Sequence, residues 1–118
     1  MAAPNLTTAT SIIGKTKASW VPNTLTAILT NTANSSQAFR INVLYVTNLS
    51  SADSVVTVDI YRNSVSYKIA NIIPVPTQNT LVVIAKDTSI YLEEGDSLRI
   101  SAGAASALQY VVSYEIMS

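Results

Sequence analysis

The sequence predicts an all-β protein, a single β-sandwich of jelly-roll type with about eight strands and an extended N-terminal arm. Apolar and polar residues alternate with a period of two over most of the chain, as they do in strands that bury one face. Polar or proline-containing segments interrupt this alternation at regular spacing, which is typical of sandwiches and barrels. No segment combines a 3.6-residue apolar repeat with helix caps, so we expect little or no helix.

The expected strands cover roughly residues 24–30, 38–48, 54–62, 65–72, 79–85, 88–92, 96–101 and 108–117. In the first of them, Leu25, Ala27 and Leu29 are predicted to share one face. In the last, the shared face is predicted to consist of Tyr110, Val112, Tyr114 and Ile116.

Turn-forming residues separate the strands at 31–37, 48–54, 62–64, 74–79 and 101–107. The segment 62–64 is predicted to be a tight hairpin turn, because asparagine tolerates a left-handed backbone. The segment 74–79 contains two prolines, which supply no hydrogen-bond donor to a sheet, so we expect it to interrupt pairing.

Residues 1–20 do not fit this pattern. We therefore assign the β-sandwich domain to residues 21–118 and treat residues 1–20 as a distinct N-terminal segment. Two interpretations stay open for them: an edge strand of the same domain, or an arm that reaches a neighbouring subunit. In the second case the predicted interface residues are Ile12, Ile13, Lys15 and Trp20.

The composition indicates a surface that is suited to packing against other subunits in an assembly. The chain has 118 residues, enough for one domain with a core of its own. Charged residues make up 12%, about half of the usual ~25%. The mean hydropathy is +0.32. A surface with so few charges is poorly solvated alone and better suited to packing against neighbours.

The composition also argues against several functional classes. Histidine and cysteine are absent, which removes the commonest general base, the commonest transition-metal ligand and all thiolate chemistry. We therefore expect no enzyme activity, no catalytic residues, no metal and no cofactor. The net charge is zero and only Lys15 and Lys17 lie close together, so nucleic acid is not an expected partner. With no apolar run near ~20 residues and no recognisable signal peptide, we expect no membrane association and synthesis in a cytoplasm.

The acidic turn at Glu93, Glu94, Gly95 and Asp96 admits three interpretations. Paired carboxylates can perform acid–base chemistry when one is buried, and carboxylates can hold Ca²⁺. The favoured interpretation is structural. Gly95 supplies a positive φ, Asp96 accepts hydrogen bonds from backbone amides, and the glutamates keep the tip of the turn solvated.

The six tyrosines also leave an alternative open. Most fall inside expected strands, where tyrosine is usually a half-buried core or interface residue. The alternative is a carbohydrate-binding platform, which requires an exposed cluster of tyrosines at one end of the molecule.

Three stretches of the chain form a recognisable pattern: "NLTTATSIIGKT", "VVTVDIYRNSVSYKIANIIPVP" and "NTLVVIAKDTSIYLEEGDSLRISAGAASALQYVVSYE". In these stretches the chain resembles a class of small virion structural proteins, of decoration or accessory type, from tailed, cyanophage-like bacteriophages. The resemblance implies a β-sandwich located in the virion and offers no catalytic residues.

On this basis we expect a capsid decoration or cement protein that stabilises the head through contacts with the major capsid protein. The alternative is a neck, tail or fibre module that could bind host surface glycan. The expected partners are other virion proteins and further copies of the chain in a homotrimer. A small-molecule ligand is not expected.

Overall fold

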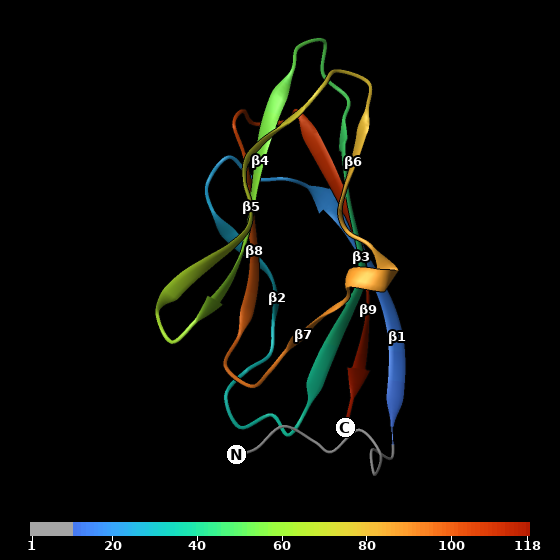
Figure 1. Cartoon of the computed structure of the whole chain (residues 1–118), viewed down its shortest axis with the longest axis vertical. Coiled ribbons are helices and arrows are strands. Elements are labelled where there is room, and N and C mark those ends of the chain that lie inside the picture. The colour runs from blue at the N-terminus through green and yellow to red at the C-terminus, as the bar shows by residue number, and fades with distance from the viewer. Residues whose placement is uncertain (1–10) are drawn as a thin grey trace.

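A computed structural model of the chain, described for residues 11–118, shows two antiparallel sheets packed face to face (Figure 1). The first, sheet A, has the strand order β1-β9-β3-β6, with β7 also paired to β3. The second, sheet B, has the order β2-β8-β4-β5. The strands are β1 (Ile12–Trp20), β2 (Thr26–Thr30), β3 (Ala38–Asn48), β4 (Ser54–Arg62), β5 (Val65–Val75), β6 (Thr80–Ile84), β7 (Ile90–Leu92), β8 (Ser97–Ala102) and β9 (Leu108–Met117).

The connectivity is that of a jelly roll, which confirms the predicted fold class. The chain passes repeatedly from one sheet to the other, so that β1, β3 and β9 lie in sheet A while β2, β4 and β8 lie in sheet B. Strands that are distant in sequence, such as β1 and β9, become neighbours, as in a pair of Greek keys.

The expected count of about eight strands is corrected to nine among residues 11–118. The additional strand is β1, which lies in the segment that the sequence allowed to be either an edge strand or an arm. The strands β6 and β7 pair with successive parts of β3, at Leu44–Thr47 and at Phe39–Ile41. They therefore lie end to end along one side of β3, separated by a single 3-10 turn, η1 (Lys86–Thr88).

Residues 12–20 form an edge strand that pairs with β9 along its whole length. All nine of its residues are exposed, which shows that no described part of sheet B buries the side chains on its inner side. Lys17 connects this edge to the other sheet: its Nζ donates a hydrogen bond to the carbonyl of Ile28, on β2, at 2.8 Å. The part of the proposed arm at 1–10 lies outside the described residues.

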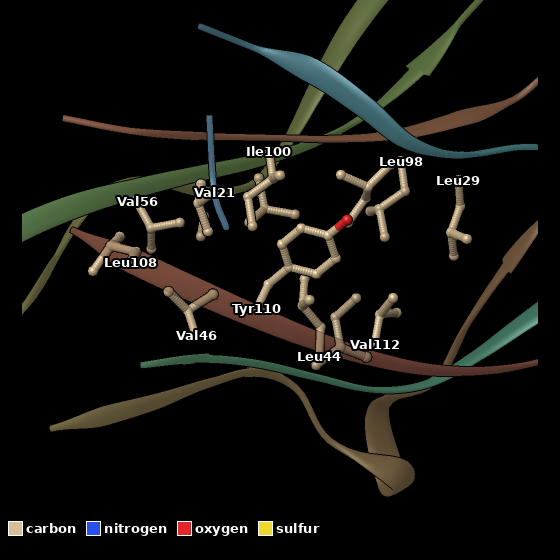
Figure 2. Packing of buried hydrophobic residues seen from close by; sticks show 14 of the residues in the cluster. Val21, Leu29, Leu44, Val46, Val56, Leu98, Ile100, Leu108, Tyr110 and Val112 are labelled. Atoms are coloured by element: carbon tan, nitrogen blue, oxygen red, sulfur yellow. The ribbon is translucent and has the colours of Figure 1, made fainter. Parts of the chain in front are cut away.

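Inward-facing residues of both sheets form one core (Figure 2). The predicted face of the last strand is confirmed, since Tyr110 and Val112 are buried and Tyr114 and Ile116 pack against the core. In Figure 2 the ring of Tyr110 extends from β9 toward Ile100 of the opposite sheet.

Two local predictions fail because the strands are irregular. In β2, Ala27 is exposed and Ile28 is buried, since a β-bulge between Ala27 and Leu29 shifts the alternation by one residue. Pro74 lies inside β5, opposite Val55, and not in a loop. Because β5 is the last strand of sheet B, a missing donor there costs little.

Candidate interaction surfaces

The outer face of sheet A carries a continuous apolar row across four strands. Val111 of β9 lies opposite Ala18 of β1 and Tyr45 of β3, and Tyr45 lies opposite Val82 of β6. The exposed fractions are 39% for Val111, 41% for Tyr45 and 49% for Val82. These four residues are called the apolar row below.

The rest of this face carries no net charge. Trp20, half exposed, follows Ala18 on the same side of β1 and lines a shallow depression of about 230 Å³ with Gln109 and Val111. On the described strands of sheet A, the charges that alternation places on this face are those of Arg40 and Glu115, which are direct cross-strand partners of opposite sign. The face therefore offers apolar area and hydroxyls without net charge.

The four predicted interface residues lie on β1 but do not share one face. Strand side chains alternate, so Ile12 and Trp20 project from the outer face of sheet A, while Ile13 and Lys15 project to the opposite side. All four are exposed. Only Trp20 lies beside the apolar row, and whether any of the four contacts another subunit remains a prediction.

The outer face of sheet B is different, because an ion-pair network links β4, β5 and β8 on it. Asp59 of β4 has an exposed fraction of 0% and lies opposite both Arg99 and Lys68. Arg99 donates to its two carboxylate oxygens at 2.9 and 2.6 Å, Ser66 donates a further hydrogen bond, and Lys68 Nζ lies 3.6 Å away. The guanidinium of Arg99 also lies over the ring of Tyr61, 4.0 Å from its centroid.

This network shifts two pKa values. Burial alone raises the pKa of Asp59, but the hydrogen bonds from Arg99 and Ser66 and the charges of Arg99 and Lys68 outweigh it, so the pKa lies below its ordinary value. The hydrogen bond to Asp59 raises the pKa of Arg99. The charged groups that β4, β5 and β8 place on this face are thus matched with one another.

The acidic turn has the favoured structural role at Gly95 and Asp96. Glu94, however, does not simply keep the tip solvated: one of its carboxylate oxygens accepts a hydrogen bond from the amide of Ser36 at 2.9 Å, and the other is buried. Gly95 adopts a φ of 88°, and Asp96, almost fully buried, accepts a hydrogen bond from the amide of Glu93 at 2.9 Å. Arg62 donates to Asp96 through Nε at 2.8 Å and Nη2 at 2.5 Å, and to Glu93 at 2.9 Å. Asp96 in turn raises the pKa of Arg62. Within residues 11–118 no group of three or more acidic side chains is arranged to hold a metal ion.

Sequence reasoning missed two buried asparagines that hold the loops. Asn31 donates to the carbonyls of Gln37 and Leu92, at 2.8 and 3.0 Å. Asn48 donates to those of Ala52 and Val75, at 2.9 and 2.8 Å. Each residue follows an alternating run and precedes a serine-rich loop, and this combination is the signal that could have identified it.

The tyrosines divide between core and surface. Tyr110 is buried, and Tyr114 stacks on Phe39 with ring centroids 5.9 Å apart. Tyr67 and Tyr91 are exposed, and both line a groove of about 400 Å³ between the β4–β5 hairpin and β7. This groove, formed by Ile60, Arg62, Tyr67, Ile90 and Tyr91, is called the tyrosine groove below.

Comparison with known proteins gives a likeness in fold alone. No family model and no curated protein matches the chain. A solved structure described as "Bacillus endospore appendages form a novel family of disulfide-linked pili" is similar, with a TM-score of 0.51 and 16% sequence identity. The likeness covers 99% of this chain and 95% of the other. In the described part of the chain, no helix is long and apolar enough to cross a membrane.

Proposed function

We propose that this chain is a non-enzymatic structural subunit that builds a larger particle through the outer face of sheet A. The observation that carries the proposal is the contrast between the two outer faces. On sheet B the charges of Asp59, Arg99 and Lys68 are matched within the face. On sheet A, by contrast, the apolar row and Trp20 are left to solvent. An exposed apolar patch on a domain of this size favours an interaction site.

The proposed occupant of this face is a second copy of the chain. A face with net charge is repelled by any surface of like charge on another copy, and here Arg40 and Glu115 offset each other across one pair of strands. A row of one alanine, two valines and a tyrosine across four strands is also compatible with packing of a second sheet. Within residues 11–118, β1 is the edge strand of sheet A, and its outer edge next to this face presents further backbone groups.

In its finer form the proposal places the subunit in a phage virion, as a trimeric decoration protein on the capsid. This form rests on the sequence resemblance. A head position predicts hundreds of copies per particle, whereas a neck, tail or fibre position predicts a small multiple of three or six, so quantitative mass spectrometry of virions separates the two. Virions lacking the protein are expected to lose thermal and osmotic stability in the first case.

A second candidate is a subunit of a pilus-like filament. The similarity of the fold to a protein of Bacillus endospore appendages supports it. Those pili are described as disulfide-linked, and this chain has no cysteine. A filament of this chain would therefore be held by non-covalent contacts, and reducing agents would leave it intact. Electron microscopy of the assembled protein distinguishes a filament from a closed oligomer.

The experiment that tests the proposed face compares two lysine substitutions by sedimentation velocity. Val111→Lys places a charge in the middle of the apolar row, and Ser101→Lys places the same charge on the outer face of sheet B. We expect Val111→Lys to weaken self-association at least about tenfold, since a desolvated unpaired charge costs more than 1.4 kcal/mol. Ser101→Lys should assemble as the wild type does. Equal effects of the two substitutions would contradict the assignment of the face, and urea unfolding of both variants checks that the fold is retained.

A further inference from the structure

We propose that the tyrosine groove is a binding site for a neutral pyranose saccharide. The groove lies where the two sheets meet on the side away from β1, between the β4–β5 hairpin of sheet B and β7 of sheet A (Figure 1). Its volume of about 400 Å³ falls in the range of small-molecule sites. No residue of the apolar row lines it, although Tyr91 lies opposite Arg40, on the same side of sheet A as that row.

The apolar part of the groove suits the face of a sugar ring. Tyr67 and Tyr91 are 57% and 42% exposed, which leaves much of each side chain open to solvent. One face of a pyranose presents C–H bonds that carry partial positive charge, and these pack on the negative face of an aromatic ring. Ile60 and Ile90 pack against the core beneath and give the site a fixed floor. Rigid walls lower the entropy that a weakly binding ligand must lose.

The polar part offers donors and acceptors side by side. Arg62 lines the groove, and its Nε and Nη2 donors are held by Asp96 and Glu93. No described residue accepts a hydrogen bond from its two Nη1 donors. The side chain of Glu93 is 61% exposed and retains acceptor capacity next to them. Neighbouring sugar hydroxyls can accept from the guanidinium and donate to the carboxylate at the same time.

The charge balance favours a neutral saccharide over an anionic one. The positive charge of Arg62 is already paired with two carboxylates, those of Glu93 and Asp96, so the site has no surplus positive charge for a sulfate, phosphate or sialic acid. A proline-rich peptide would also use exposed tyrosines. Such a peptide has few donors that could hydrogen-bond to the carboxylate of Glu93. The hydroxyls of a saccharide can donate to Glu93 and accept from Arg62. This proposal departs from the expectation that no small-molecule ligand binds, and the test below decides between the two.

The test is nuclear magnetic resonance of the full chain with defined oligosaccharides. The neutral probes are maltotetraose, mannotetraose and lacto-N-tetraose, the anionic probe is sialyllactose, and a proline-rich decapeptide is the peptide probe. We expect saturation transfer to at least one neutral probe, with chemical-shift changes confined to Tyr67, Tyr91, Arg62 and their neighbours.

Substitutions then assign the site. Tyr67→Ala and Tyr91→Ala should each weaken binding about tenfold, as expected for the loss of one stacked ring. Leu49→Ala, which removes an exposed apolar side chain outside both the groove and the apolar row, should leave the affinity unchanged. The proposal is overturned if no neutral probe binds, if sialyllactose or the peptide is preferred, or if binding survives both groove substitutions. Because Tyr67 and Tyr91 are exposed, replacing them with alanine should leave the packing of the core intact, so a loss of binding reports on the groove.

Discussion

Removal of the Asp59 carboxylate should destabilise the sandwich more than any other single change to a charged residue considered above. Asp59 is fully buried, accepts two hydrogen bonds from Arg99 and one from Ser66, and lies beside the ammonium of Lys68. Loss of one partner from a buried ion pair typically costs about 3–5 kcal/mol. Because Arg99 is 20% exposed, water can partly solvate its guanidinium, which places Asp59→Ala near the lower end, at about 3 kcal/mol.

The assay is urea unfolding followed by circular dichroism, with Asp53→Ala as the matched control. Asp53 is an exposed aspartate whose carboxylate accepts one hydrogen bond, from the amide of Thr77. Its removal should cost no more than about 1 kcal/mol. Equal losses for the two variants would refute the idea that burial and ion pairing at Asp59 organise the outer face of sheet B.

The same carboxylate predicts how stability depends on pH. The pKa of Asp59 is lower in the folded protein than the value of about 3.9 in an unfolded chain. Its contribution is therefore fully present above pH ~4 and is lost as the pH falls through the folded pKa. Asp59→Asn should flatten the acid side of the stability profile relative to wild type. A variant profile parallel to that of the wild type below pH ~4 would show that other carboxylates cause the acid loss.

Two further predictions concern local packing, and both are measured by urea unfolding. Gly103→Ala should destabilise by about 1–3 kcal/mol, because an added Cβ would lie 2.8 Å from Cγ2 of the stiff side chain of Val55. At Gly14 an added Cβ would meet no atom within 4 Å, so Gly14→Ala should be neutral. A larger loss of stability for Gly14→Ala than for Gly103→Ala would contradict the close approach of Gly103 to Val55. Asn48→Ala removes a fully buried amide with two donated hydrogen bonds and should cost about 3 kcal/mol, while Asn79→Ala, at an exposed position, should cost under about 1 kcal/mol.

The fold class could be predicted from the sequence because its signal is local and repeated. The closing strand is regular, so its alternation placed Tyr110 and Val112 on the core side correctly. The hairpin at 62–64 was also predictable: Asn63 and Ser64 adopt φ values of 52° and 61°, as a two-residue turn requires. The bulge in β2 was not predictable, because Ile28 and Leu29 are both apolar and alternation cannot decide which residue is displaced.

The surfaces could not be predicted, because they depend on contacts between distant segments. The apolar row exists only because β1 pairs with β9, β9 with β3 and β3 with β6. The tyrosine groove likewise joins Tyr67 and Tyr91, which lie on different sheets. The acidic turn was interpreted correctly as structural, but its partner Arg62 is distant in the sequence and gave no local signal.

The most direct measurement of whether the chain is an assembly subunit is its mass in solution as a function of concentration. Sedimentation equilibrium of the unmodified protein, from low micromolar to near-millimolar concentration, should show a weight-average mass that rises from 12.6 kDa toward a defined multiple. A mass that stays at 12.6 kDa over the whole range would contradict self-assembly through the outer face of sheet A.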